Sequence, residues 1–365
     1  EGLLAFFAEA TFLGLWIFGW ERLPKGVHLA CIWLVSIGTT LSAYFILAAN
    51  AWMQHPVGYV LDQQTGKAHL TDIWAVLFQN TTLVAVFHTL TAAFMTGAAF
   101  VMGVSAWHLA RRHEVEVFRP SLRLGLWVAL VASLVVVFSG DVQAKIMTEQ
   151  QPMKMAAAEA LYNNAAPASF SIFTIGSLSG EQEIWSLRVP YVLSFMATGN
   201  PTAEVEGIND VQRQSEERFG PGNYRPYVPL TYWTFRLMVG FGAIVTLLSL
   251  LGLWLTRRGR LPQGRWFWRL AMIAIAAPFL GNAAGWIFTE MGRQPWVVFG
   301  TMLTANGVSP AVSLAEGTIA TVVFTVLYTV IAVIDGALMA RYARSVPPAA
   351  PAEEPEESGV LAFAY

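Results

Sequence analysis

Charged residues and cysteines are scarce in this 365-residue chain. Charged residues make up 13% and hydrophobic residues 55%, and the mean hydropathy is +0.50. Soluble domains carry about 25% charged residues, so the composition excludes an ordinary cytosolic enzyme and a disordered chain. The net charge of −2 provides no basis for binding nucleic acid. Cys31 is the only cysteine, which excludes an intramolecular disulfide and a metal site made of several cysteines.

Long apolar stretches dominate what is present. A helix needs about 20 apolar residues to cross a bilayer, and seven stretches approach or exceed that length. They lie at 2–20, 28–49, 80–107, 122–139, 230–255, 267–289 and 316–340. The pattern predicts an all-α polytopic membrane protein with seven transmembrane helices, four within 1–140 and three within 230–340.

The connecting segments differ in positive charge. One alternate set of loops, together with the start of the tail, carries eleven basic residues: Arg22, Lys25, Arg111, Arg112, Arg119, Arg257, Arg258, Arg260, Arg265, Arg341 and Arg344. The loops at 50–79 and 290–315 carry only Lys67 and Arg293. Because basic loops remain in the cytoplasm, we expect the N-terminus of this sequence outside and the C-terminus inside.

Two segments lie outside the spans. Residues 141–229 form a polar connection of nearly ninety residues that retains aromatic side chains. Since loops of this length are usually functional, we predict an ordered, outward-facing substrate module there. Residues 341–365 include a Pro/Ala/Glu-rich stretch, which predicts a disordered cytoplasmic tail.

His88 and Met238 lie at similar depth from the outer ends of their spans. A neutral imidazole and a thioether can both bind haem iron, so the two residues form a possible axial pair. A hydrogen bond between helices and ordinary packing are the alternatives for His88 and Met238. Arg236 precedes Met238 by two residues and needs an acidic partner, which a haem propionate would provide, unless its side chain reaches the interface.

Carboxylates are also found in or near the predicted spans. Glu1 and Glu9 are eight residues apart, which is close to two turns of one helix face, and Ser42 on the next helix extends a polar line. This pattern indicates a proton path, whereas capping by Glu1 and helix pairing by Glu9 are the alternatives. Glu290 ends the sixth span, either as a metal ligand or as part of a plain helix end before Pro295.

Several motifs together resemble one family. Gly285-Trp286-Ile287-Phe288-Thr289-Glu290-Met291-Gly292-Arg293-Gln294-Pro295-Trp296 is similar to a motif of subunit I of the cytochrome bd-type quinol oxidases. Similar motifs of that family are Glu1 to Glu9, Ala49 to Gly58, Gly140-Asp141-Val142-Gln143 followed by Lys154 and Glu159, and Phe235-Arg236-Leu237-Met238. The matches follow the family's order over nearly the whole chain.

The resemblance implies residue roles. His88 and Met238 match the axial ligands of a low-spin haem b, and Glu290 matches a ligand of a high-spin haem. Lys154 and Glu159 match positions used in quinol oxidation. Further residues match polar or acidic positions beside the haems or on the proton path: Glu1, Glu9, Ser42, Asn50, Arg236, Trp286 and Arg293.

The resemblance also implies function, cofactors and partners. Family members oxidise quinol and reduce dioxygen to water without pumping protons, using low-spin haem b, high-spin haem b and haem d. They lie in the bacterial cytoplasmic membrane, so the lipid bilayer surrounds them. The expected protein partner is a second membrane subunit, and the number of small single-span subunits stays open. No nucleic acid is expected.

The family pattern predicts nine spans, two of which would precede Glu1, with a histidine ligand among them. We therefore expect this sequence to be part of a longer subunit. Two alternatives remain at this stage. One is a truncated paralogue without the oxygen site, and the other is a haem-free proton-coupled transporter that uses Glu9 and Asp335.

Overall fold

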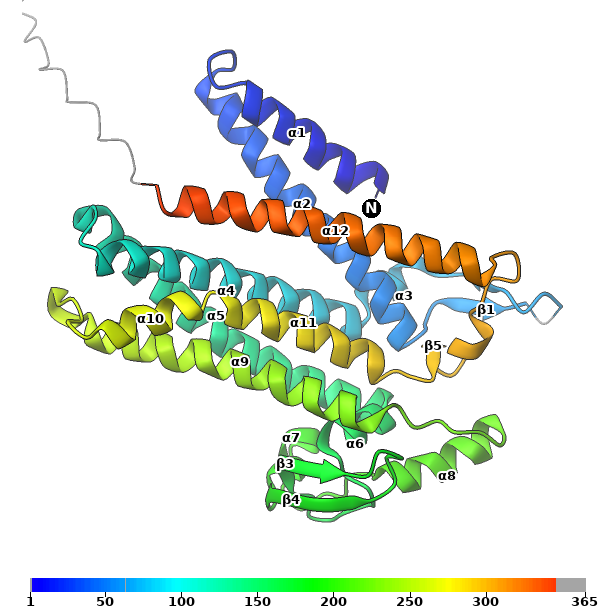
Figure 1. Cartoon of the computed structure of the whole chain (residues 1–365). Coiled ribbons are helices and arrows are strands. Elements are labelled where there is room, and N and C mark those ends of the chain that lie inside the picture. The colour runs from blue at the N-terminus through cyan, green and yellow to red at the C-terminus, as the bar shows by residue number, and fades with distance from the viewer. Residues whose placement is uncertain (1, 63, 346–365) are drawn as a thin grey trace, which may run out of the picture.

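Long helices form most of the structure, a computed structural model that describes residues 2–62 and 64–345 (Figure 1). Within these residues, six helical stretches are long and apolar enough to cross a membrane: α2 (Lys25–Gln54), α4 (Asn80–Ala110), α5 (Val115–Gln150), α9 (Val228–Leu255), α10 with α11 (Arg265–Met291) and α12 (Leu314–Ala343). The chain is therefore a predominantly helical membrane protein. The first predicted span is shorter, with a π-helix at Gly2–Phe6 and α1 at Phe7–Phe18.

Four helices form the central bundle: α4, α5, α9 and α11 (Ala276–Met291) pack against one another. Small side chains let the backbones approach closely, as is common between membrane helices. Ala98, Ala129, Ala132 and Ala277 lie in one buried cluster with Met95 and Val245. A second cluster around Met102, Leu126 and Phe267 joins α10 (Arg265–Ile273) to the same bundle.

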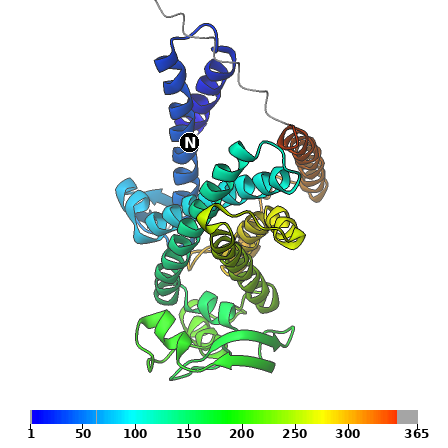
Figure 2. The same cartoon turned by 90° about the vertical axis from the view of Figure 1, so that its left-hand side faces the viewer.

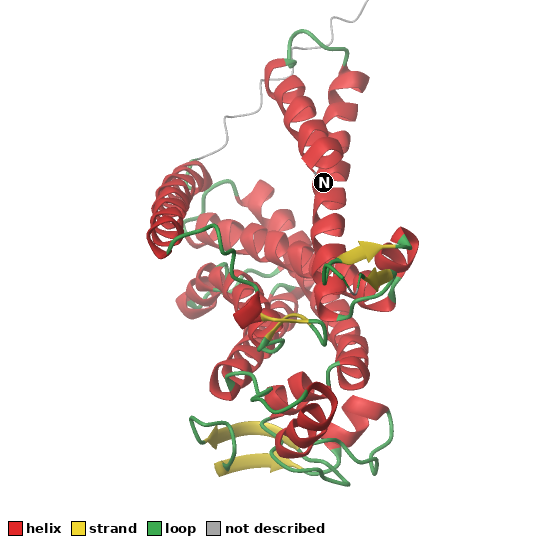
Figure 3. Ribbon diagram, turned by 90° about the vertical axis from the view of Figure 1, so that its right-hand side faces the viewer, coloured by secondary structure: helices red, strands yellow, loops and turns green. Residues whose placement is uncertain are grey.

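The connection between α5 and α9 is an ordered module at one end of the bundle (Figures 1 and 3). It contains α6 (Pro152–Glu159), β3 (Phe170–Gly176), β4 (Glu183–Val189), α7 (Val192–Thr198) and α8 (Ile208–Phe219). Strands β3 and β4 form an antiparallel hairpin in which Phe170 pairs with Val189 and Thr174 pairs with Ser186. We call residues 151–227 the loop module. The module is ordered, and its role in binding substrate stays a prediction.

Shorter elements lie in the other connections. Strands β1 (Tyr59–Leu61) and β2 (Ala68–Leu70) form a hairpin before α3 (Ile73–Phe78). Strands β5 (Trp296–Val298) and β6 (Met302–Leu303) pair after α11. Short 3-10 helices occur at Arg257–Gly259 and Thr304–Asn306.

The α1–α2 hairpin and α12 bury little of their surface within this chain (Figure 2). In α1 and in α12 no residue is buried, although both helices are apolar. An apolar helix without a protein neighbour is stable where lipid or another membrane helix surrounds it. Its exposure here therefore agrees with a chain that lies in a membrane.

Several boundaries differ from the sequence prediction. Helix α5 continues to Gln150, eleven residues beyond the predicted end at 139, because the segment after Gly140 remains helical although it is polar. Turn residues 274–275 separate α10 from α11 within the predicted span 267–289. Helix α12 reaches Ala343, so the tail predicted from 341 begins later, and residues 346–365 lie outside the described part of the chain.

Candidate functional site

Lys154 anchors the beginning of α6 to the membrane helices. Its Nζ donates to Gln54 Oε1 on α2 at 3.1 Å and to the backbone oxygen of Thr289 on α11 at 3.0 Å. The Nε2 of Gln151 also donates to Gln54 Oε1, at 3.1 Å. We call Lys154, Gln54, Gln151 and Thr289 the Lys154 junction. Three segments that are far apart in sequence meet there, and the Lys154 residue is only 7% exposed.

Glu290, Asn50 and Arg293 meet directly beside this junction. Asn50 Nδ2 donates to Glu290 Oε1 at 2.6 Å, and Arg293 Nη2 forms an ion pair with Glu290 Oε2. The residues come from α2, from the end of α11 and from the turn after it. The structure thus brings together Glu290, which the resemblance predicts as a haem ligand, and two residues predicted to lie beside the haems. Trp286, one turn before Glu290, is 45% exposed.

Glu159 anchors the other end of α6. Its Oε2 pairs with Arg236 Nη2 on α9 at 2.7 Å and accepts the backbone N–H of Ser171 at 3.1 Å. We call Glu159, Arg236 and Ser171 the Glu159 junction. Glu159 is 1% exposed, and the Arg236 guanidinium lies 4.7 Å from the Phe170 ring. The acidic partner that the sequence required for Arg236 is therefore Glu159, although other nitrogens of Arg236 remain available.

Burial alters proton affinity at both ends of α6. Burial lowers the pKa of Lys154 to about 7, while Glu290 acts to raise it and Arg293 to lower it. Burial raises the pKa of Glu159, although Arg236 and the Ser171 N–H act in the opposite direction. Both residues can consequently exchange protons nearer neutral pH than an exposed lysine or glutamate. Lys154 and Glu159 are thus buried and do not form a solvated charged face of α6.

His88 lies on α4 beside Ser139 of α5. Its Nδ1 is 2.8 Å from the Ser139 hydroxyl, which also lies 3.2 Å from the Val136 backbone oxygen. In the tautomer whose Nδ1–H donates to Ser139, that hydroxyl is free to donate to Val136. The Nε2 atom then carries a lone pair, which is the form that binds iron.

Met238 lies on α9 and faces α11. A Cβ atom added at Gly285 would lie 2.8 Å from Met238 Sδ, so the absence of a side chain at Gly285 provides the space for the thioether. Arg236 and Arg293 each have buried nitrogens, Nε and Nη1, without a hydrogen-bond partner in the described chain. Buried guanidinium groups require acceptors, and a carboxylate such as a propionate provides them.

The residues predicted for a proton path have a different setting. Glu9 lies half-buried in the first turn of α1, where its Cβ is 3.5 Å from a Cβ added at Gly38 of α2. Ser42 follows Gly38 by one turn on α2. Glu1 lies outside the described residues. The predicted common face of Glu1 and Glu9 assumed a regular α-helix, but residues 2–6 form a π-helix, which changes the angular spacing.

Sequence reasoning missed the polar residues that support these groups. Gln54 and Gln151 complete the Lys154 junction, and the Ser139 hydroxyl lies 2.8 Å from His88 Nδ1. Gln54 lies within the motif from Ala49 to Gly58, and Ser139 directly precedes Gly140. Their position inside or next to a predicted motif was therefore the only sign in the sequence that these polar residues support the site.

Comparison with known proteins identifies the family. The model of the family described as cytochrome bd terminal oxidase subunit I matches residues 1–347. The chain belongs to the cytochrome bd terminal oxidase subunit I family. It is 43% identical over 332 residues to Bacillus subtilis (strain 168) cytochrome bd ubiquinol oxidase subunit 1, covering 91% of this chain and 70% of that protein.

Two further relatives agree with this assignment. Escherichia coli (strain K12) cytochrome bd-II ubiquinol oxidase subunit 1 is 30% identical, with 98% of this chain and 80% of that protein covered. The solved structure of bd oxidase from Geobacillus thermodenitrificans has a TM-score of 0.79 and 30% identity, covering 92% of this chain and 75% of that chain. The cytochrome bd family implies haem cofactors and a membrane complex with a subunit II.

The residues of this cytochrome bd chain fit haem groups. His88 presents a ligand nitrogen, Met238 presents a thioether beside Gly285, and two buried arginines retain unpaired nitrogens. A haem needs axial donors and partners for its propionates, and these groups provide both kinds.

Proposed function

We propose that this chain is the haem-bearing subunit of a terminal respiratory oxidase that oxidises quinol and reduces dioxygen to water. The observation that supports it most is the attachment of α6 at both ends. Lys154 bonds to α2 and α11, which carry Asn50 and Glu290, and Glu159 bonds to α9, which carries Met238. The residues proposed for quinol are thus connected to the helices that would hold the haems.

His88 and Met238 would hold the low-spin haem b, and Arg236 would bind a propionate through its free nitrogens. Glu290 would hold a high-spin haem, either high-spin haem b or haem d, with Asn50, Arg293 and Trp286 around it. When bound, haem supplies redox-active iron for electron transfer and for binding oxygen. The carboxylate of Glu290 is oriented by Asn50 and Arg293, which is a supporting shell that a ligand requires.

Within the loop module, Glu159 would accept a proton from quinol as a general base, and Lys154 would bind the oxygen of the quinone ring. A base is most effective when its pKa lies near the working pH, and burial moves Glu159 in that direction. Residues 141–229 would form the extracytoplasmic quinol-binding region, although their first ten residues belong to α5.

Glu9, Glu1 and Ser42 would conduct protons from the cytoplasm toward the oxygen site. Proton uptake inside and release outside generate a proton motive force without pumping. This arrangement requires the orientation inferred from the basic loops, with the multi-pass chain in the bacterial cytoplasmic membrane. Subunit II, and any small single-span subunits, would cover exposed apolar helices such as α12.

The test is a visible spectrum and an oxygen-consumption assay on the purified complex. We expect bands of low-spin haem b, high-spin haem b and haem d, and oxygen consumption that depends on added quinol. A complex that contains every span yet shows neither haem bands nor quinol-dependent oxygen consumption would overturn the proposal. Glu9→Gln, measured by stopped-flow, should slow oxygen reduction but leave the reduction of low-spin haem fast.

A further inference from the structure

Glu159 is almost completely enclosed, so a proton that it accepts needs a way out. At 1% exposure, its carboxylate cannot release a proton directly to bulk water. The charged groups that face it are Arg236 from α9 and Arg188 from β4, and neither conducts protons because a guanidinium remains charged. Neutral hydroxyl groups can conduct protons, since each both donates and accepts a hydrogen bond.

Three buried hydroxyl groups lie next to Glu159. Ser171 Oγ is 2.8 Å from the Tyr232 hydroxyl and 2.7 Å from Thr174 Oγ1. Ser171, Thr174 and Tyr232 are each at most 2% exposed. The Ser171 backbone N–H donates to Glu159 Oε2 at 3.1 Å, so Ser171 connects the carboxylate to the other two hydroxyl residues. We call Ser171, Thr174 and Tyr232 the hydroxyl chain.

The hydroxyl chain leads along β3 toward a polar pocket. Thr174 and Gly176 lie two residues apart on β3, with a register shift between Ile175 and Gly176. The Tyr162 hydroxyl packs against Gly176, where an added Cβ would lie only 1.8 Å from it, so only glycine permits this approach. Tyr162 and Tyr232 also belong to the same buried cluster. Tyr162 therefore lies between the hydroxyl chain and the pocket.

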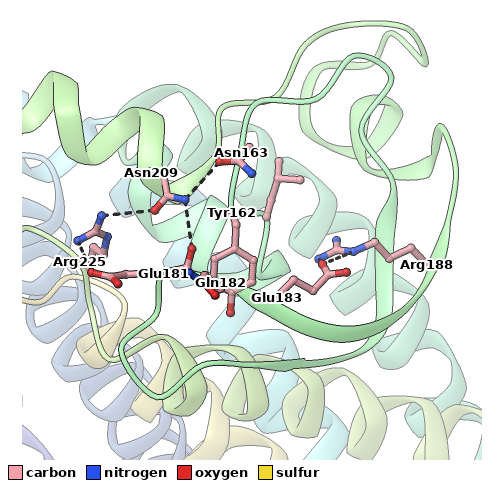
Figure 4. Close-up of a pocket in the computed structure, with 9 residues that line it drawn as sticks. Tyr162, Asn163, Glu181, Gln182, Glu183, Arg188, Asn209 and Arg225 are labelled. Atoms are coloured by element: carbon pink, nitrogen blue, oxygen red, sulfur yellow. Dashed lines mark hydrogen bonds and ion pairs between the residues drawn. The ribbon is translucent and has the colours of Figure 1, made fainter.

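The pocket has a volume of about 740 Å³, and Tyr162 lines it together with Glu181, Glu183, Arg188 and Arg225 (Figure 4). Glu181 and Glu183 are exposed, so water enters the pocket from outside. Two ion pairs hold its rim, Arg188 with Glu183 at 2.7 Å and Arg225 with Glu181 at 3.7 Å. Burial raises the pKa of Tyr162, so its hydroxyl stays protonated and acts as a donor and acceptor.

We propose that the hydroxyl chain and Tyr162 form the release path for the proton that Glu159 takes from quinol. Quinol oxidation yields two electrons, which bound haem would accept, and two protons, of which one protonates Glu159 and the other is released directly to water outside. Glu159 gives its proton to Ser171, whose own hydroxyl proton moves to Thr174 or to Tyr232. The proton of that hydroxyl then leaves through Tyr162 to water in the pocket. Each hydroxyl ends with as many protons as it had at the start.

This inference rests on the proposed role of Glu159 in quinol oxidation, and the experiment separates the two. The complex carries Thr174→Val, Thr174→Ser or Tyr232→Phe, with Tyr224→Phe as the matched control. Tyr224 is another buried tyrosine of the loop module, and its hydroxyl donates to the Gly220 backbone oxygen at 3.1 Å, outside the hydroxyl chain. Oxidation of a short-chain ubiquinol and a short-chain menaquinol is measured in H2O and D2O, with haem content from the spectrum.

We expect Thr174→Val to slow quinol oxidation about tenfold, less than the loss of a general base, because water can partly replace one hydroxyl. The solvent isotope effect should increase, since proton transfer then limits turnover. Thr174→Ser should restore both values, Tyr232→Phe should show a smaller change, and Tyr224→Phe should match the wild type. If Thr174→Val fails to assemble, the isotope effect of Tyr232→Phe decides.

Two results would overturn the inference. Wild-type rates and isotope effects in Thr174→Val and Tyr232→Phe, while Glu159→Gln is slow, would refute the release path and leave the role of Glu159 intact. Equal losses in Thr174→Val and Thr174→Ser without a larger isotope effect would show that packing is responsible. Normal quinol oxidation in Glu159→Gln would refute the proposed role of Glu159 and the path with it.

Discussion

The two ends of α6 attach the loop module to the membrane helices in different ways. At the Glu159 junction, a buried carboxylate forms an ion pair with Arg236. At the Lys154 junction, a buried ammonium donates to two neutral oxygens, those of Gln54 and Thr289. Burial outweighs the ion pair at the first junction, so the pKa of Glu159 is raised although Arg236 is bonded to it, and burial lowers the pKa of Lys154 to about 7. One short helix thus presents two groups that can change their protonation, one beside a bonded counter-ion and one between neutral oxygens.

The largest expected effect is the loss of low-spin haem in variants of His88 and Met238, which lie outside both junctions. His88→Ala should remove the low-spin haem spectrum, because no other donor replaces the Nε2 ligand, while high-spin haem remains. Met238→Leu should convert the same haem to high spin, since His88 still binds the iron. Difference spectra of the reduced complex measure both outcomes. A normal low-spin spectrum in His88→Ala would contradict the assignment.

The second expected effect breaks the Glu159 junction. Glu159→Gln leaves the Arg236 guanidinium buried without its counter-ion, which costs about 3–5 kcal/mol of stability. Quinol oxidation should fall by about 10² or more if Glu159 is the base. Thermal unfolding and steady-state oxidation measure these changes. The haem spectrum should be unchanged.

A double variant separates stability from catalysis at this junction. Glu159→Gln combined with Arg236→Gln should recover part of the stability but none of the activity. Arg213→Gln serves as the control, because the Arg213 side chain is 69% exposed and its ion pair with Asp210 contributes at most about 1 kcal/mol. Equal effects of Glu159→Gln and Arg213→Gln on stability would show that the Glu159 junction is not an anchor.

The third expected effect concerns the pH dependence of stability at the Lys154 junction. The pKa of Lys154 falls from its ordinary 10.5 to about 7 on folding. The unfolded chain therefore binds more protons between pH 7 and 10.5, and stability increases with pH over this window. Burial of the Lys154 ammonium lowers the free energy of unfolding by its full amount below pH 7 and has no effect above pH 10.5. In the wild type, the unfolding temperature should therefore rise between pH 7 and 10.5, and in Lys154→Met this rise should be lost. A Lys154→Met variant with the pH profile of the wild type would contradict the lowered pKa of Lys154.

The smallest expected effect comes from giving the Lys154 junction an ion pair like that of the Glu159 junction. Gln54→Glu replaces a neutral acceptor of Lys154 with a carboxylate, which should raise the pKa of Lys154. The window in which stability increases with pH should then become narrower. Gln54→Leu, which removes the acceptor, should widen it. The same series of unfolding temperatures measures both variants, and identical windows would show that Gln54 has no influence on Lys154.

The sequence alone predicted the positions of the long helices, because uninterrupted apolar residues define a membrane span without reference to the fold. It placed the end of α5 too early, because the segment after Gly140 is polar and is stabilised by contacts with the loop module. The first span was predicted as regular, but apolar content does not distinguish a π-helix from an α-helix.

For the site, the sequence identified Glu290, Asn50 and Arg293, which the structure joins by a hydrogen bond and an ion pair. It could not identify Glu159 as the partner of Arg236, because 77 residues separate them and only the folded loop module brings them together. Gln54 and Ser139 were missed for a similar reason, since their importance arises from what they contact.

Helix α5 has a mechanical consequence for the enzyme. Its 36 residues give a length of roughly 54 Å at 1.5 Å per residue, against roughly 30 Å of hydrocarbon in a bilayer. Past Pro120 it continues without a break to Gln150, and only Gln151 separates it from α6, so it acts as a stiff lever up to the loop module. A change in bilayer thickness that tilts the bundle would swing the loop module through a similar angle. With quinol bound at α6 as proposed above, membrane composition would then change how far the quinol ring must rise from the lipid.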